Sequence, residues 1–290
     1  MPELPDLLYI QKYLVKEIRG RTIKDTLVKQ QVVLRVAIPR AFESTLRNLT
    51  IKGIHLRGPF LRFELSNDVD IILNLMLAGR LQHQRDGEKT DGHLCCSLFL
   101  DDASRLNLCD DERMAKLYVV ASGDYLAVPR FTAQGVDILS REFTRSKFGE
   151  LLEAHSRKQV RVFINDHTIL SAIGNAYADE ILFEARIHPK TFVGKLRDEE
   201  RDQLFAAIPN VMKWGCQQVT NAGQPIQKKV RNHMRVRNRH GEPCVHCGTK
   251  IRREGVRGYD VYFCPQCQPA GRTLFIDWSP ASPQNKKGTP

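Results

Sequence analysis

The sequence predicts an α+β fold in which a β-rich region is followed by a helical one. Short β-type runs separated by turns occupy positions 20–122. After position 137 the apolar residues recur at i, i+3 and i+4, which is the spacing of one helix face. At 290 residues the chain is long enough for two domains with a sizeable core.

Residues 1–16 predict a helix that precedes the β-rich region. Asp6 is a candidate N-cap, and Leu8, Ile10 and Leu14 would form the buried face. In this interpretation the Pro-Glu-Leu-Pro opening is only a lead-in to the helix.

Several short strands follow, at a spacing typical of a β-sandwich or a barrel. The β-type segments are 31–39, 51–65, 69–77, 93–100 and 115–121. Residues 85–92 are polar and contain glycine, so we expect a hairpin loop there.

Helical runs dominate the second half of the chain. They cover residues 143–155, 158–165, 175–187 and 197–219. Pro209 lies inside the last run and is expected to bend it.

The charge of the chain indicates a polyanionic partner. The net charge is +11 and the isoelectric point is near 9.4. Residues 228–257 alone contain ten Lys or Arg and two acids. No apolar run approaches the ~20 residues of a membrane span, and the N-terminus lacks the basic residues of a signal peptide. We therefore expect a cytoplasmic protein, or a nuclear one in a eukaryote.

The eight cysteines fall into two groups. Four of them lie in apolar contexts typical of reduced structural thiols: Cys95, Cys96, Cys109 and Cys216. The other four form the pattern C-x2-C-x16-C-x2-C: Cys244, Cys247, Cys264 and Cys267. Four thiolates in two knuckles suit tetrahedral Zn(II) with no open coordination position, and they suit a redox role less well. We expect one structural Zn²⁺ that holds a β-hairpin, with the surrounding cations contacting phosphate.

The opening residues offer a second kind of chemistry. Pro2 is small enough for Met1 to be removed, which would leave a terminal secondary amine next to Glu3. An α-amino group titrates near ~8 and a lysine near ~10.4, so roughly a tenth of the terminal amine is free base at neutral pH. A free amine can attack a sugar C1′ and form an iminium intermediate, and Glu3 could pass protons beside it.

Residues 171–180 place Gly174 and Asn175 at a turn where a helix begins. Backbone N–H groups at a helix N-terminus favour an anion, and Asn175 could add a side-chain donor to a phosphate oxygen. Alternatively, Asn175 merely caps the helix.

These features occur together, and in the same order, in the formamidopyrimidine-DNA glycosylase and endonuclease VIII family. The opening PELPD resembles the family's PELPE motif. Residues 169–189 resemble its helix–two-turn–helix signature, and the segment around the four cysteines is similar to its C-terminal zinc finger. The resemblance extends from position 2 to about 268.

The resemblance implies an N-terminal helix and two-layer β-sandwich, then a helix–two-turn–helix domain with a β-hairpin zinc finger. The expected boundaries are 1–130, 131–227 and 228–268, with a basic disordered tail at 269–290. It also implies a DNA-repair enzyme that acts on double-stranded damaged DNA, and we expect it to be monomeric. The damaged base is flipped out, Pro2 attacks C1′, Glu3 handles protons, and the iminium permits β- and then δ-elimination.

Several residues depart from the family pattern at positions that grip phosphate. Asp6 stands for the motif's second glutamate. Pro59 stands where a hairpin lysine is expected, with Arg57 and Arg62 nearby as substitutes. Tyr259 stands for an arginine of the finger, with Arg257 two residues earlier. Arg161 stands for a lysine and keeps its charge.

The residues expected to fill the space left by the flipped base also differ. Leu77 stands for methionine, next to Met76, and Glu112 and Met114 stand for arginine and phenylalanine. Arg113 lies beside the misplaced acid and is a candidate DNA contact.

Three functional hypotheses follow. The first is a bifunctional DNA glycosylase and AP lyase with an altered lesion preference. The second is a catalytically weakened member that binds damaged DNA. The third, a zinc-ribbon protein that binds RNA, is disfavoured by the β-rich half and by the motif at 171–180.

Overall fold

The computed structural model describes residues 1–85, 87–256 and 258–271. Its first element, α1, spans Leu4–Ile18 and confirms the predicted N-terminal helix. The N-cap is Glu3 and not Asp6. Asp6 is the third helical residue, and its Oδ2 accepts the backbone N–H of Glu3 at 2.8 Å. The prediction of Asp6 as the N-cap was therefore wrong. Asp6 is the N3 residue of a capping box whose N-cap is Glu3.

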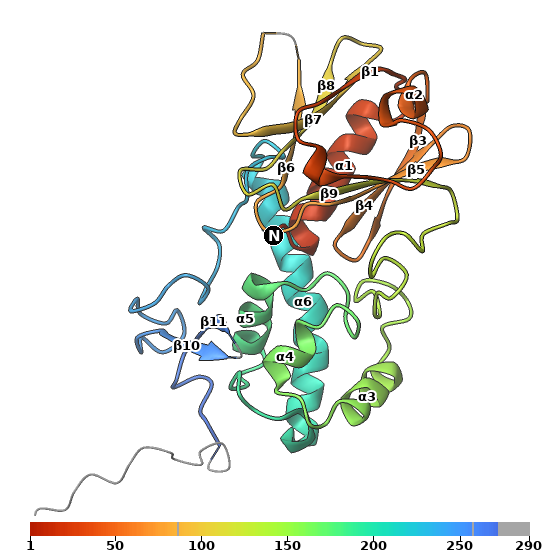
Figure 1. The fold of residues 1–290 in the computed structure, drawn as a ribbon. Coiled ribbons are helices and arrows are strands. Elements are labelled where there is room, and N and C mark those ends of the chain that lie inside the picture. The colour runs from red at the N-terminus through yellow and green to blue at the C-terminus, as the bar shows by residue number, and fades with distance from the viewer. Residues whose placement is uncertain (86, 257, 272–290) are drawn as a thin grey trace, which may run out of the picture.

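The β-rich region forms two packed sheets, so the predicted β-sandwich is confirmed (Figure 1). The four-stranded sheet has the order β1 (Ile23–Val28), β7 (Leu94–Leu100), β8 (Arg105–Cys109) and β6 (Arg80–Gln84). The five-stranded sheet has the order β2 (Leu34–Val36), β9 (Lys116–Ala121), β5 (Val69–Asn74), β4 (Phe60–Leu65) and β3 (Ile51–Arg57). All neighbouring pairs are antiparallel except β2 and β9.

The segment 85–92 does not close a hairpin. It joins β6 to β7, and each of these strands pairs with β8. A polar, glycine-bearing segment is equally suited to a longer connection, so composition alone could not separate the two.

The sandwich core contains the apolar face of α1. Leu14 and Ile18 are fully buried against sheet residues such as Ile51 and Leu61. Two short elements, η1 (Gln31–Val33) and α2 (Phe42–Leu46), complete this half. Burial raises the pKa of the Cys96 thiol to about 12, so this cysteine stays protonated.

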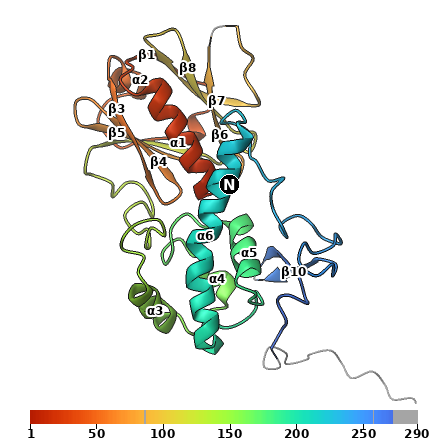
Figure 2. The same cartoon turned by 180° about the vertical axis from the view of Figure 1, so that it is seen from behind.

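The second half is helical, as predicted. It contains α3 (Arg145–Ala154), α4 (Val160–Ile164), α5 (Asn175–Glu184), η2 (Val193–Lys195) and α6 (Asp198–Ala222). The last of these continues through Pro209 and packs against α1, so it ties the two halves together (Figure 2). Leu4 belongs to the helical core and Leu8 packs against it, while Leu7, Ile10, Leu14 and Ile18 of the same helix belong to the sandwich core.

The predicted hairpin between the cysteine pairs is formed by β10 (Arg252–Val256) and β11 (Tyr259–Phe263). Two buried acids of α5 bind the finger and the segment before it. Asp179 Oδ2 accepts hydrogen bonds from the backbone N–H of Tyr262 in β11 at 3.3 Å and from Nη1 of Arg237 at 2.8 Å. Glu180 accepts the backbone N–H groups of residues 235–237. The α5 helix thus has one end in the site described below and its flank on the finger.

Within the described residues, no helix is long and apolar enough to cross a membrane. The domain boundaries at 130, 227 and 268 stay predictions. The predicted disordered tail lies almost wholly outside the described residues.

Candidate functional site

The N-terminus of the chain lies where the sandwich meets the helical half (Figure 1). Glu3 is buried there, and its carboxylate caps the N-terminus of α5. Its two oxygens accept the backbone N–H groups of Ala176 and Tyr177 at 2.9 and 3.0 Å. The anion expected at this helix N-terminus is therefore the chain's own Glu3.

Gly174 makes this contact possible. A Cβ at position 174 would lie 2.5 Å from Cγ and Cδ of Glu3. The glycine is needed for close approach, since its φ of −100° is open to any residue. It couples the helix–two-turn–helix segment to the first residues of the chain.

A buried ion pair fixes the other side of the N-terminus. Arg231 donates two hydrogen bonds to Asp6, at 2.8 Å to Oδ1 and 2.6 Å to Oδ2. The Asp6 side chain is 6% exposed. Asp6 therefore links α1 to the basic segment after α6. Its predicted DNA contact stays a prediction.

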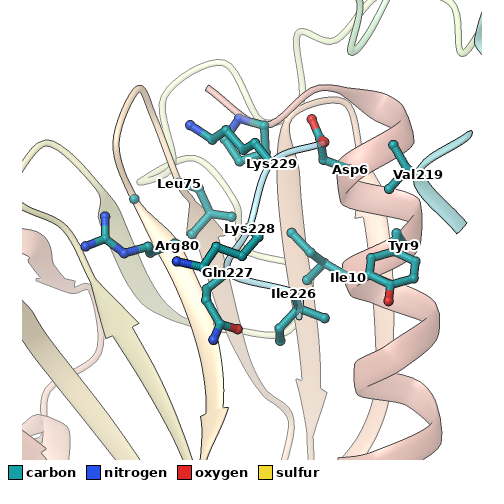
Figure 3. A pocket seen from close by; sticks show the side chains of 12 residues that line it. Asp6, Tyr9, Ile10, Leu75, Arg80, Val219, Ile226, Gln227, Lys228 and Lys229 are labelled. Carbon is teal, nitrogen blue, oxygen red and sulfur yellow. The ribbon is translucent and has the colours of Figure 1, made fainter. Parts of the chain in front are cut away.

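The terminal amine lies next to a lysine. The amine of Met1 and Nζ of Lys229 each donate to the carbonyl oxygen of Leu77 at 2.9 Å. Burial, and then the charge of Lys229, lower the pKa of the amine to about 6. Pro2 and Lys229 also line one small pocket, and Figure 3 shows Lys229 beside the start of α1 that carries Asp6.

A cleft of about 520 Å³ opens beside the N-terminus. It brings together residues predicted from distant parts of the sequence: Met1, Pro59, Leu77, Asn175 and Tyr259. Lys116 and Arg130 line it as well. A cleft that combines the chain's terminus, an amide donor and cations can hold an extended anionic ligand.

Asn175 points its oxygen into the protein. Its Oδ1 accepts Nη2 of Arg161 at 3.0 Å and Nδ2 of Asn165 at 3.1 Å, which leaves its own Nδ2 as a donor to the cleft. The N-cap of α5 is Gly174, so the alternative of Asn175 as a simple cap is wrong.

Arg161 was predicted to contact phosphate, but its side chain is 3% exposed. Its Nε donates to Asp179 Oδ1 at 2.8 Å. Its Nη2 donates to Oδ1 of Asn175 at 3.0 Å, so Arg161 orients Asn175, and its predicted DNA contact stays a prediction. Tyr259, by contrast, is 53% exposed and lines a second recess with Arg161.

The arginines near Pro59 have internal partners. Arg57 donates to the carbonyl oxygens of Phe131 and Thr132 at 2.8 and 3.2 Å. Arg62 donates to the Tyr125 hydroxyl at 2.8 Å. The geometry therefore argues against either arginine as the substitute for the missing lysine; Arg57 as a DNA contact stays a prediction without support here.

The predicted wedge residues are exposed at one end of the sandwich. Leu77 is 59% exposed and Met114 is 38% exposed. Leu77 lies in the loop that follows β5, and Met114 lies in the loop that precedes β9. The end of β5 pairs with the start of β9 through Asn74 and Lys116, so both loops lie at the same end of the sheet. Exposed apolar side chains at neighbouring loops are suited to insertion between bases. Glu112 and Arg113 lie in the second loop, with Arg113 at a φ of 55°.

The four cysteines form a metal centre. The Sγ atoms of Cys244, Cys247, Cys264 and Cys267 all lie within 4.8 Å of one another. Tetrahedral zinc with Zn–S bonds of ~2.3 Å separates its sulfurs by about 3.8 Å. The Cys244–Cys267 distance is 3.8 Å and the Cys247–Cys264 distance is 3.4 Å, so the donor set fits one structural zinc ion.

Sequence reasoning placed Gly174 at a turn but missed its contact with Glu3, and it missed Lys229 and Arg231 as residues of this site. All three act on the N-terminus across more than 150 positions of sequence. For Lys229 and Arg231, the signal in the sequence was the density of Lys and Arg after residue 227.

Comparison with known proteins agrees with this arrangement. Residues 1–117 match the model of the formamidopyrimidine-DNA glycosylase N-terminal domain. Residues 134–224 match the H2TH domain of the same glycosylase, and residues 241–270 match the zinc finger found in FPG and IleRS.

Whole-chain relatives carry the same description. The formamidopyrimidine-DNA glycosylase of Cytobacillus firmus is 30% identical over 275 residues, which cover 92% of this chain and 100% of the relative. That of Bacillus cereus is 29% identical over 280 residues, covering 93% and 99%.

Solved structures show the same fold. MutM (Fpg) from Thermus thermophilus superposes with a TM-score of 0.81 at 26% identity, covering 93% of this chain and 100% of the other. Lactococcus lactis Fpg, in a complex with DNA containing an oxidized pyrimidine, superposes with a TM-score of 0.84 at 23% identity, with the same coverage. The chain belongs to the formamidopyrimidine-DNA glycosylase family.

Proposed function

We propose that the protein is a base-excision repair enzyme, a DNA glycosylase and AP lyase whose nucleophile is the amine of Pro2 after removal of Met1. The observation that carries the proposal is the position of the terminus. Glu3 is held by the N-terminus of α5, and Met1, two residues before it, lines the cleft together with Asn175. Pro2 lies between Met1 and Glu3 and lines the small pocket beside Lys229. A nucleophile must be held in near-attack geometry. The two hydrogen bonds from α5 to Glu3 fix the residue next to Pro2.

The chemistry requires an unprotonated amine. In the structure, burial and the charge of Lys229 lower the pKa of the Met1 amine to about 6. We propose that the same surroundings favour the free base of the Pro2 amine once Met1 is removed. Attack of the Pro2 nitrogen on C1′ forms an N–C1′ bond and expels the damaged base. Opening of the sugar ring then gives an iminium, with the proton delivered to the ring oxygen, and loss of the C2′ proton begins strand cleavage. Glu3 is the neighbouring carboxylate for these proton transfers.

The partner we propose is double-stranded damaged DNA. Nδ2 of Asn175 is directed at a phosphate, and Leu77 and Met114 enter the space left by the flipped nucleotide. The zinc finger packs against α5 through β11 and adds cations such as Arg252 of β10. The wedge carries an acid, Glu112, and the cleft lacks the expected lysine, so we propose a lesion preference different from that of the family pattern.

One observation favours the alternative of a weakened enzyme that binds damaged DNA. The two arginines nearest to Pro59 in the sequence, Arg57 and Arg62, donate to partners inside the protein, and Tyr259 offers no charge. The cleft then grips the lesion's phosphate less firmly than the pattern requires.

A nicking assay separates the two functions. Duplexes that carry an abasic site or an oxidised base are incubated with the wild type, Pro2→Gly and Glu3→Gln. The proposal predicts nicking by the wild type and a loss of at least a hundredfold in Pro2→Gly, while DNA affinity is retained. Tight binding without nicking by the wild type would establish the alternative.

A further inference from the structure

Four cations, three of them from the segment after α6, lie close to the N-terminus or to its pocket. They are Arg80 of β6, together with Lys228, Lys229 and Arg231. Three of them are neutralised by a carboxylate: Arg80 by Asp111 at 2.9 Å, Lys228 by Asp91 at 3.0 Å, and Arg231 by Asp6 at 2.6 Å. Among the residues that the structure describes, Lys229 forms no ion pair.

Lys229 also lies closest to the terminal amine. Its ammonium and the amine share one acceptor, the carbonyl oxygen of Leu77, each at 2.9 Å. The two nitrogens are therefore no farther apart than two hydrogen bonds laid end to end. Glu3 is the acid that faces the amine, but both of its oxygens are occupied by α5.

Two positive charges at such separation repel each other, and the group with the lower proton affinity loses its proton first. A primary ammonium on a lysine stem holds its proton more strongly than an α-amine does. The terminal amine is therefore the partner that becomes neutral. Removal of Met1 moves the amine to Pro2, which lines the same pocket as Lys229.

From this geometry we infer that Lys229 is a positioning residue for the proposed reaction: its unpaired ammonium keeps the terminal amine as the free base, and its hydrogen bond to Leu77 holds the wedge loop beside that amine. The inference rests on the proposed function for its catalytic meaning. The inference gives a role to the unpaired cation beside the nucleophile, in a chain where Pro59 and Tyr259 replace two expected cations.

The test is the pH dependence of borohydride trapping on duplex DNA that carries an abasic site, at saturating protein. In Lys229→Met we expect the midpoint to rise by roughly half a unit to one unit, since burial supplies the larger share of the effect and remains. Below the midpoint, trapping should slow about three- to tenfold. Lys229→Arg keeps the charge and should keep the wild-type midpoint.

Lys228→Met is the matched control. It removes one cation from the same segment, but that cation is paired with Asp91. It should leave the midpoint unchanged. If Lys229→Met instead slows trapping equally at every pH, Lys229 only supports the Leu77 loop, and the inference is overturned.

A second readout does not depend on catalysis. The pH dependence of acetylation of the terminal amine in the free protein, followed by mass spectrometry, reports the proton affinity of that amine directly. If the wild type fails to trap DNA yet the amine titrates low and shifts upward in Lys229→Met, the proposed function fails while the assignment of Lys229 stands. An unchanged titration in Lys229→Met would refute the assignment whether or not the protein cuts DNA.

Discussion

Gly174→Ala tests whether the helix–two-turn–helix segment positions the nucleophile. The added methyl carbon would lie 2.5 Å from Cγ and Cδ of Glu3. Carbon atoms pack at about 3.5 Å, so the Glu3 side chain must retreat by about 1 Å. It then weakens two hydrogen bonds to backbone N–H groups, now 2.9 and 3.0 Å long.

The expected cost follows from those bonds. A hydrogen bond to a charged group contributes about 1.5–3 kcal/mol, and alanine recovers about 0.4–1 kcal/mol by restricting the unfolded chain. We expect a net loss of about 2–4 kcal/mol in the free energy of unfolding. Because Pro2 adjoins Glu3, a displacement of about 1 Å should lower the nicking rate on the order of a hundredfold.

The assay pairs denaturant unfolding with single-turnover nicking of an abasic duplex. Gly149→Ala is the control, since Gly149 lies in α3 with nothing near the position of a Cβ. It should raise stability by about 0.5–1 kcal/mol and leave nicking unchanged. Wild-type stability and nicking in Gly174→Ala would refute the idea that α5 holds Glu3 and, through it, Pro2.

Three further predictions follow from the structure. Asp6→Asn leaves Arg231 without its anion and should lower the free energy of unfolding, measured in denaturant, by about 2–4 kcal/mol. The control, Asp25→Asn, breaks a surface pair with Arg47 and should cost under about 1 kcal/mol. Equal costs for the two variants would contradict the burial assigned to the Asp6–Arg231 pair. Cys264→Ser should lose zinc, measured by metal analysis, and should lose DNA binding, while the circular dichroism of the β-sandwich persists. Normal DNA binding by this variant would show that the finger does not contact DNA. The logarithm of DNA affinity should fall linearly with the logarithm of salt concentration, and a flat response would exclude phosphate contacts as its main source.

The elements with local patterns could be predicted from the sequence. The β-runs, the helical runs and the cysteine spacing each depend on residues a few positions apart, and the structure forms all of them. The hairpin expected at 85–92 failed because the partner of both flanking strands, β8, lies later in the chain. Strand pairing is a tertiary property that loop composition does not fix.

The candidate site was predictable in its residue types but not in its connections. Pro2, Glu3 and Asn175 could be singled out, yet nothing local indicates that Glu3 would occupy the N-terminus of α5, 173 positions away. The charge of Arg161 is visible in the sequence, but its burial beside Asp179 is not. Long-range pairing decides which charges remain available to DNA.

The most direct test of the central claim is to map the covalent adduct. The purified protein, with removal of Met1 verified, is trapped by borohydride on duplex DNA that carries an abasic site, and the crosslinked peptide is identified by mass spectrometry. The account predicts a single attachment at the nitrogen of Pro2, lost in Pro2→Gly. Attachment at Lys229 or another lysine, or tight binding with no adduct, would contradict it.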